Sequence, residues 1–421
     1  MTKLLILIVV VLGILAIAQL ARVYELTARL RGKREEDISA ADNRMNAMLM
    51  WLFPVVYFGF FIWLVVAYGD KMLPLAASEH GAETDWLLNF NWVILLIAFV
   101  LTNVLLFYFA GKYVFSKDRR AAWYPHNNKL ELIWTVIPAG VLAVIVIYGL
   151  NTWNNITGPA SPNAVLVELY AKQFDWTARY PGQDGVMGAS DFRLINGTNP
   201  LGIVTPESVK ERLAEMEAEI AEMDSVLAHS VMPDEKAAEL RDLLERSRRQ
   251  QARVVNLRTV MEQDIKEKGE ASIYLHGADD IVTKEFHLPV HKEVKMLIRS
   301  RDIIHSVYIP HLRAQMNAVP GMTTTIKMVP TITTDSMRTA VVMDDTFDFV
   351  VLCNKICGAS HYNMQMPLTV TTADEYTAWM AEQMKKPFQA SAAPAEVPAN
   401  TVPADSTAAV PANAQAAVKT N

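Results

Sequence analysis

The sequence predicts a protein in two parts: membrane-spanning helices, then an all-β domain into which a helical hairpin is inserted. Three observations predict this fold class. Four apolar stretches long enough to cross a bilayer fall at about 4–21, 48–68, 92–109 and 132–150 of the 421 residues. Short segments of β composition, separated by turn residues, fill much of the remainder. Between two groups of these segments, residues 205–268 are highly charged and carry a helical repeat.

The positive charges between the apolar stretches predict the orientation of the four transmembrane helices. Six Lys and Arg residues separate the first and second stretches and five separate the third and fourth, whereas the second-to-third connection holds only Lys71. Because Lys and Arg are enriched in cytoplasmic loops, both basic connections are expected inside and everything after residue 150 outside. The sequence therefore predicts a multi-pass protein of a bacterial inner membrane with its β domain in the periplasm.

The first apolar stretch has an alternative interpretation as a cleaved signal peptide. Lys3 would be its basic end, and small residues near Ala16 and Ala18 would surround the cleavage point. Removing it would reverse the later helices and place the six-charge connection outside. The charge pattern therefore favours a retained helix.

The rest of the chain divides into a β domain, an insert and a tail. Strands are predicted at 164–170, 271–276, 284–288, 293–298, 323–329 and 339–342. In the insert, apolar stripes over 213–227 and 240–257 flank the turn Met232-Pro233-Asp234, which predicts an antiparallel helical hairpin. This hairpin is either a solvated decoration or a docking arm for a neighbouring complex. The predicted units are 1–70 and 71–152 for two transmembrane hairpins, 153–204 with 269–385 for the β domain, 205–268 for the insert, and 386–421 for a disordered tail rich in Ala and Pro.

Both cysteines of the chain fall in one twelve-residue run, Cys353-Asn354-Lys355-Ile356-Cys357-Gly358-Ala359-Ser360-His361-Tyr362-Asn363-Met364. A strand-like segment leads into this run, and His305 follows another predicted strand. Two thiolates, imidazoles and a thioether are soft ligands that suit copper. A zinc site would leave no reason for the methionine, a single blue copper needs one cysteine, and two bridging thiolates imply two metals. The alternative is a disulfide between the two cysteines, which would need neither the histidine nor the methionine.

These residues resemble the dinuclear CuA site of cytochrome c oxidase subunit II, whose loop reads Cys-x-Glu-x-Cys-Gly-x-x-His-x-x-Met. The resemblance covers most of residues 90–380 and implies that the periplasmic domain is a cupredoxin-like Greek-key β-barrel. The ligands that it implies for two copper ions are His305, Cys353, the main-chain carbonyl of Lys355, Cys357, His361 and Met364, with both thiolates bridging.

The run departs from the family at Lys355, where the family has Glu. In the family that Glu side chain also helps to hold magnesium against subunit I. An ammonium cannot ligate a cation, so the departure argues against magnesium in this protein. We expect the Lys355 ammonium to take its place.

A second stretch of the resemblance begins the fourth transmembrane helix. Glu131 precedes Ile133-Trp134-Thr135 and Pro138, as an acid precedes Ile-Trp-Thr-x-x-Pro in the family. The family carboxylate lies at the mouth of a proton channel into subunit I, which implies proton uptake for Glu131. From the residues alone, Glu131 also suits a plain helix N-terminus, where a negative charge is favourable.

A third stretch, Gln173-Phe174-Asp175-Trp176, aligns with the Gln-Trp-x-Trp run of the family. The first Trp of that run receives the electron from cytochrome c, and Phe174 occupies its position here. The candidates for electron acceptance are therefore Phe174, Trp176 and Tyr180, and core packing is the alternative role for each.

The resemblance implies subunit II of a bacterial cytochrome c oxidase. Such a subunit passes electrons from cytochrome c to haem in subunit I, where haem and a further copper reduce oxygen to water while protons are pumped. No Cys-x-x-Cys-His haem attachment sequence is present, so the donor is expected to be a separate chain. The other expected partners are subunit I, further oxidase subunits, membrane lipid and a respiratory supercomplex. The family usually has two spans, so the first two here are an addition.

Charge and site chemistry limit the rival functions. The net charge of −6 argues against nucleic acid and would suit a basic electron donor, although much of the acidity lies in the insert. A quinol oxidase subunit II would lack the copper ligands. A membrane-tethered copper carrier or assembly factor would need neither paired thiolates nor Glu131. Nitrous oxide reductase has a similar loop on a much longer soluble chain.

Overall fold

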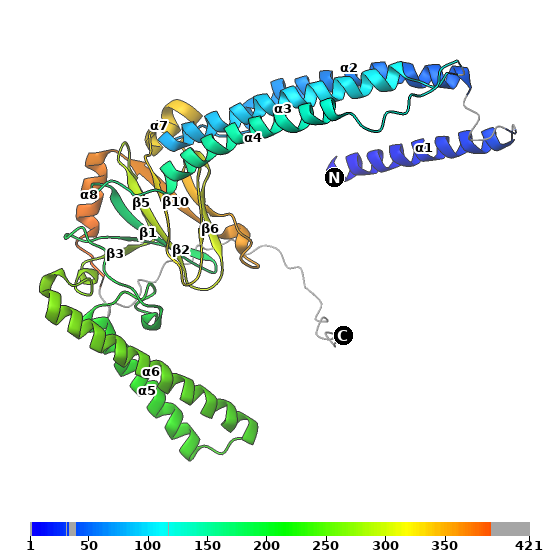
Figure 1. Cartoon of the computed structure of the whole chain (residues 1–421). Coiled ribbons are helices and arrows are strands. Elements are labelled where there is room, and N and C mark those ends of the chain that lie inside the picture. The colour runs from blue at the N-terminus through cyan, green and yellow to red at the C-terminus, as the bar shows by residue number, and fades with distance from the viewer. Residues whose placement is uncertain (1, 31, 33–38, 117, 389–421) are drawn as a thin grey trace.

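The computed structural model describes residues 2–388 except 31, 33–38 and 117 (Figure 1). The predicted disordered tail lies outside the described residues from 389 onward. In the described part of the chain, four helices are long and apolar enough to cross a membrane. They are α1 (Thr2–Leu30), α2 (Ala40–Tyr68), α3 (Glu79–Lys112) and α4 (Asn128–Thr157).

Helices α2, α3 and α4 lie side by side as a long bundle, whereas α1 lies apart from them (Figure 1). The side chains of Ser39, Ser78 and Asn127 cap the N-termini of α2, α3 and α4, because each accepts a hydrogen bond from an amide of the first turn. Most large apolar side chains on these helices are exposed. That pattern is expected of helices whose solvent is lipid.

Ten strands form two five-stranded sheets that face one another across an apolar core. One sheet has the order β3-β2-β1-β5-β8 and the other β4-β10-β9-β6-β7. The strands are β1 (Val165–Lys172), β2 (Asp175–Tyr180), β3 (Ile281–Thr283), β4 (Phe286–Pro289), β5 (Val294–Ser300), β6 (His305–Ile309), β7 (Ala314–Ala318), β8 (Thr324–Met328), β9 (Phe349–Cys353) and β10 (Gln365–Thr371). This is the predicted cupredoxin-like β domain.

The alternation of apolar residues decides which side of each strand enters the core. In β5, Val294, Met296 and Ile298 are buried while the residues between them are partly exposed. Strand β9 buries Phe349, Val351 and Cys353 in the same way. Cys353, the first predicted thiol ligand, therefore lies at one end of this core.

Two predicted strands are wrong. Residues 271–276 form short turns, which are stabilised because the buried Ser272 hydroxyl donates to Asp264. The β-branched residues of 339–342 lie in a wide helical turn, Met337–Val342, that follows the short helix α7 (Thr334–Ser336). Thr333 caps that helix, so a local cap overrides the strand propensity. A further helix, α8 (Ala373–Gln383), follows β10.

The insert is a hairpin of α5 (Pro206–His229) and α6 (Asp234–Lys268) that projects from the sheets (Figure 1). A capping box between Thr205 and Ser208 begins α5. The apolar core of the hairpin consists of Leu194, Val204, Val209, Met216, Val254 and Met261. Leu243, which the stripe of the second helix predicts to be covered, is 52% exposed.

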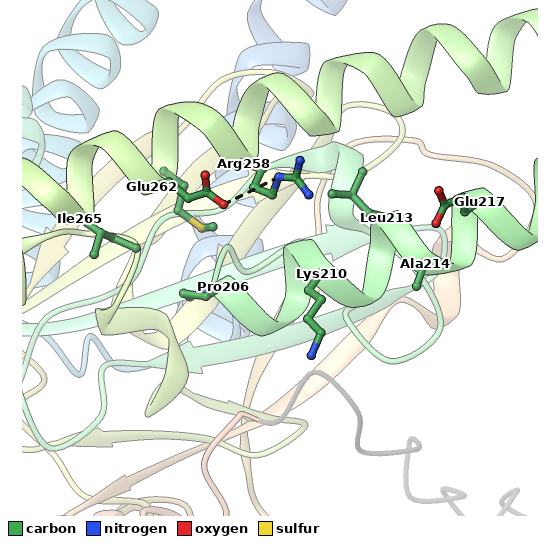
Figure 2. A pocket seen from close by; sticks show the side chains of 9 residues that line it. Pro206, Lys210, Leu213, Ala214, Glu217, Arg258, Glu262 and Ile265 are labelled. Atoms are coloured by element: carbon green, nitrogen blue, oxygen red, sulfur yellow. Dashed lines mark ion pairs between the residues drawn. The ribbon is translucent and has the colours of Figure 1, made fainter.

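An open groove of about 590 Å³ lies between α5 and α6 (Figure 2). Both apolar and charged side chains line it, and Arg258 pairs with Glu262 at 3.8 Å. The lining residues are Pro206, Lys210, Leu213, Ala214, Glu217, Arg258, Met261, Glu262 and Ile265. None of them is a predicted site residue.

Hydrogen bonds and an ion pair attach the β domain to the helix bundle. Arg313 donates to both carboxylate oxygens of Asp85 on α3, at 2.8 and 2.9 Å. The Ser78 hydroxyl donates to the carbonyl of Leu312 at 2.6 Å, and Lys327 donates to the carbonyl of Pro159 beyond α4. These contacts fix the position of the β domain relative to α3 and α4.

Candidate metal centre

Two neighbouring strands carry His305 and Cys353 to the same end of the sheet. Strand β6 begins at His305, and β9 ends at Cys353. The strands pair antiparallel with Val307 opposite Cys353. The amide of Asn354 then donates to the carbonyl of Ser306 at 3.0 Å, so the chain is still held as it leaves the sheet.

The loop that follows Cys353 returns to its own starting point. After Cys357 the chain makes a single 3₁₀ turn, His361–Asn363, and enters β10. Because β10 pairs with β9, Met364 lies next to Cys353, whose amide donates to the Met364 carbonyl at 3.1 Å. The strand pairing and one turn thus determine where all loop ligands lie.

The structure brings all six predicted ligand groups together. The Sγ atom of Cys353 lies 3.8 Å from Nδ1 of His305, 3.2 Å from the carbonyl oxygen of Lys355 and 3.8 Å from Sγ of Cys357. The Sγ atom of Cys357 lies 3.5 Å from Nδ1 of His361 and 3.8 Å from Sδ of Met364. The two sulfur atoms therefore lie at the centre of the cluster.

The donor set fits copper. His305, Cys353, Cys357 and Met364 are buried, and the ligand atoms of the first three lie within 4.8 Å of one another. Both cysteines are free thiols, and their 3.8 Å separation is far longer than a disulfide bond. Buried sulfur and imidazole ligands select soft or borderline metals over magnesium and calcium.

Hydrogen bonding orients His305 toward the thiols. Its Nε2 atom lies 2.8 Å from Oδ1 of Asp302, where an N–H donates to the carboxylate. Nδ1, which then carries the lone pair, faces Cys353. A carboxylate behind a metal-binding imidazole is a common arrangement, because it fixes both tautomer and ring orientation.

Burial and hydrogen bonding shift the pKa values of two groups at the site. Burial, followed by the neighbouring Cys353, raises the pKa of the Cys357 thiol to about 11. Burial would also raise the pKa of Asp302, but hydrogen bonds from the Gln173 amide and from His305 outweigh it and lower that pKa below its usual value. A positive ion between the sulfurs would therefore find Asp302 already ionised and would stabilise the thiolates.

The turn between β1 and β2 covers the loop beside Cys357. The Gln173 side-chain amide donates to the Cys357 carbonyl at 2.5 Å. The half-buried Phe174 ring lies against Gly358, whose φ of 133° strongly favours glycine. A Cβ at that position would come within 2.9 Å of Cζ of Phe174, so residue 358 must lack a side chain.

The three aromatic candidates for electron acceptance differ in position. Phe174 is half-exposed and lies against Gly358 of the loop between Cys353 and Met364. Trp176 is 1% exposed and packs edge-on against His305, with ring centroids 6.2 Å apart. Tyr180 is fully buried, and its hydroxyl bonds to the backbone of His287.

Glu131 and Lys355 lie outside the ligand cluster. Glu131 is in the first turn of α4, where its carboxylate accepts from the amide of Asn127 at 3.3 Å while Asn127 caps Leu130. This contact satisfies the helix N-terminus and leaves the carboxylate partly exposed. Lys355 is exposed, and no carboxylate in the described part of the chain forms an ion pair with it.

Sequence reasoning missed two residues of the site, Asp302 and Gln173. Neither supplies a predicted ligand atom, yet both form hydrogen bonds with ligand residues. The main-chain amide of Gln173 also donates to Asp302 at 2.7 Å. Asp302 precedes His305 by three residues, which was a usable signal. Gln173 is 184 residues from Cys357, so only the folded structure reveals that contact.

Fold and site together define a membrane-anchored, cupredoxin-like protein with a buried cluster of soft groups that could hold a metal. Two family models match the chain: the transmembrane domain of cytochrome c oxidase subunit II at residues 66–152, and its periplasmic domain at 259–373. An alternative cytochrome c oxidase subunit 2 from Bradyrhizobium diazoefficiens is 30% identical over 336 residues, covering 76% of this chain and 90% of that protein. The cytochrome c oxidase subunit 2 of a Synechocystis species is 23% identical, covering 82% and 84%.

The chain therefore belongs to the cytochrome c oxidase subunit II family. It is a membrane protein with a periplasmic domain, and that domain belongs to a copper-binding type with which the His and Cys cluster is compatible. The periplasmic domain of subunit II from Bradyrhizobium japonicum aligns over 55% of this chain and 99% of its own at 14% identity, with a TM-score of 0.27. The family assignment depends on the sequence matches, since that score is low.

Proposed function

We propose that this chain is the electron-accepting subunit II of a bacterial cytochrome c oxidase in the inner membrane. It takes electrons from a separate cytochrome c and passes them to haem in subunit I, where oxygen is reduced to water and protons are pumped. The observation that carries this proposal is the pair of buried thiols 3.8 Å apart, surrounded by two imidazoles, a thioether and a carbonyl.

The residues that would hold two copper ions as a CuA centre are His305, Cys353, Lys355 through its carbonyl, Cys357, His361 and Met364. When bound, the copper pair would supply one-electron redox chemistry. The strands β6 and β9 hold the ligands in place, and Asp302 and Gln173 restrain His305 and the loop. Ligands held in this way move little when the charge at the centre changes, which favours fast electron transfer.

Phe174 is the proposed contact surface for the donor, and Trp176 is the proposed buried link to His305. The half-exposed ring of Phe174 can be touched from outside, whereas Trp176 touches the copper ligand from inside. Magnesium is not part of this proposal, because the exposed Lys355 ammonium replaces the family carboxylate.

Copper content and electron paramagnetic resonance of the purified oxidase complex test the proposal. Three coppers per complex are expected, two in this chain and the further one in subunit I, together with a seven-line signal from one electron shared by two copper nuclei. A Cys357→Ser variant should lose that signal, since one of the two thiolates that would hold the copper pair is gone. Zinc in place of the copper pair, or only two coppers in the unmutated complex without the seven-line signal, would refute the proposal.

Glu131 is proposed to take up protons from the cytoplasmic side for subunit I. A Glu131→Gln variant keeps an oxygen that can accept from the Asn127 amide but cannot ionise. Steady-state oxygen consumption should fall by about 10-fold or more, while the copper signal stays unchanged. Full activity in Glu131→Gln, with loss only in a Glu131→Ala variant, would assign Glu131 to helix capping alone.

A further inference from the structure

The outer surface beside the candidate metal centre is formed by two loops that meet. The amide of Gln173, in the β1–β2 turn, donates to Asp302 in the β5–β6 loop at 2.7 Å. The Gln173 side chain reaches the Cys357 carbonyl, and Phe174 lies against Gly358. A protein that delivers an electron through this cover must therefore dock on these two loops.

The charges on this surface are positive in sum. The ionisable residues at the ends of these two loops are Lys172, Asp175, Arg301 and Asp302. Lys284, in the connection between β3 and β4, reaches Asp175, whereas Glu285 of that connection instead accepts from Trp379 on α8. Lys284 pairs with Asp175, and Asp302 is bonded to His305 and the Gln173 amide. Both carboxylates are therefore already engaged within the protein, and a docking partner meets mainly cations.

Lys172 and Arg301 are neighbours on this surface. Strands β1 and β5 run parallel with Ala171 beside Ser300, and the Arg301 amide donates to the Ala171 carbonyl at 2.9 Å. Arg301 is exposed, and no carboxylate in the described part of the chain forms an ion pair with it. Lys172 lies 3.7 Å from Asp175, which Lys284 already occupies. The nearby Arg299 is neutralised by the buried Glu168.

This local charge is opposite to that of the whole chain, which is −6. The inserted hairpin helices α5 and α6 account for much of the difference, since they hold 15 acidic residues against 11 Lys and Arg. The net charge of the chain is therefore a poor guide to its donor. The copper loop, residues 353–364, contains a further exposed cation, Lys355, and no Asp or Glu.

We propose that the electron donor docks on Lys172, Phe174 and Arg301 and presents an acidic face around its redox centre. The inference rests on the proposed electron-accepting function and names the class of partner. Phe174 would make the desolvated apolar contact at the centre, and the two cations would attract and orient the carboxylates of the donor at the rim. A basic cytochrome would meet like charge on this surface.

Charge reversal in the purified oxidase complex tests this inference. The variants are Lys172→Glu, Arg301→Glu and their combination, and the matched control is Lys236→Glu, an exposed cation on α6. The probes are two reduced c-type cytochromes, one with an acidic and one with a basic surface around the haem edge. Oxidation rates are measured from about 10 to 200 mM ionic strength, a range over which screening changes strongly.

The unmutated complex should oxidise the acidic cytochrome faster at low salt, and this preference should shrink as salt rises. The double variant should lose about 10-fold or more in kcat/KM for the acidic donor and gain for the basic donor, with kcat little changed. Lys236→Glu should behave like the unmutated complex. A preference for the basic donor, equal rates for both, or a double variant that matches Lys236→Glu would overturn the inference.

Two further readouts separate this inference from the proposed function. A small uncharged reductant, which needs no docking surface, should support oxygen consumption equally in all variants, and each should keep the two-copper signal. If those readouts hold but the unmutated complex prefers the basic cytochrome, the inference of an acidic donor is wrong and the electron-accepting role stands. If the unmutated complex lacks a two-copper signal, the proposed function itself fails.

Discussion

The loop from Cys353 to Met364 and the inserted hairpin are stabilised in opposite ways. The hairpin is closed by a core of apolar side chains, including Met216, Val254 and Met261, and its charged side chains face water. The loop instead directs sulfur, imidazole and carbonyl groups inward and leaves Ile356 and Tyr362 86% exposed. The ligand chemistry therefore dictates the loop sequence, whereas apolar periodicity dictates that of the hairpin.

This difference predicts that substitutions in the two regions have separate effects. A change in the loop should alter copper binding with little effect on unfolding of the hairpin. A change in the hairpin core should do the reverse. The variants below are ordered from the largest expected effect to the smallest. A variant that changed both copper binding and hairpin unfolding would contradict this separation.

Gly358→Ala should have the largest effect, on the copper loop. The added Cβ would meet the Phe174 ring at 2.9 Å and would force alanine to adopt a φ of 133°. Backbone strain of about 1–3 kcal/mol plus the clash should displace Cys357 and weaken copper retention by about 100-fold. Copper bound per chain after dialysis against a chelator measures this.

A double variant, Gly358→Ala with Phe174→Leu, removes the ring from the clash and is the control. Retention should recover in part, since the φ strain remains. If the double variant is no better than Gly358→Ala, the contact with Phe174 does not explain the need for glycine.

Met216→Ala should have the largest effect in the hairpin. Met216 is 2% exposed in the hairpin core, so its truncation leaves a cavity and should lower the free energy of unfolding of the insert by about 3 kcal/mol. Hydrogen exchange of α5 and α6 in the purified full-length protein measures it. Leu243→Ala, at a 52% exposed position of α6, should change stability by less than about 0.5 kcal/mol. Loss of the copper signal in Met216→Ala would contradict the separation.

A buried ion cluster connects the β domain to the segment that leads to the insert, and it has its own pH dependence. Arg179 donates to Glu168, to Asp280 and, at 2.7 Å, to the carbonyl of Gly188 in the segment leading to the insert. Asp280 is fully buried, and one of its oxygens has no partner among the described residues. Burial raises the pKa of Asp280 from 3.8 to about 6, although Arg179 opposes this rise.

Because the pKa of Asp280 is higher in the folded chain, the folded state binds more protons than the unfolded state between about pH 4 and 6. The free energy of unfolding should therefore fall by about 2 kcal/mol as the pH rises through this window. The difference between the unmutated protein and Asp280→Asn, followed by thermal unfolding at several pH values, isolates this contribution. Identical pH dependence in both proteins would show that Asp280 stays ionised throughout the window.

The sequence predicted different parts of the molecule for different physical reasons. Apolar length predicted the four transmembrane helices, and helical periodicity predicted the hairpin. The ligand set followed from the resemblance of the run 353–364 to the family loop, and all of its residues except His305 lie in that run. The segment 339–342 was misassigned because its β-branched residues suggested a strand, whereas the cap at Thr333 and the hydrogen bond from Arg338 to the Phe347 carbonyl hold helical turns. Contacts between distant segments, such as Gln173 with Cys357, leave no periodic pattern in a sequence.

Asp302→Ala should have the smallest effect and is the sharpest test of how the loop is held. Asp302 supplies no predicted ligand atom, but it accepts from His305 at 2.8 Å and from the Gln173 amide at 2.7 Å. Losing both bonds frees the imidazole to rotate or change tautomer, which should weaken copper affinity by about 10-fold, as measured by competition with a chelator. Asp302→Asn keeps an oxygen for one of the two donors, so its affinity should fall between those of the unmutated protein and Asp302→Ala. Hydrogen exchange in α5 and α6 should not change in either variant, because the hairpin core contacts neither His305 nor Gln173. If Asp302→Ala bound copper as tightly as the unmutated protein, the strand pairing of β6 with β9 alone would be enough to orient His305.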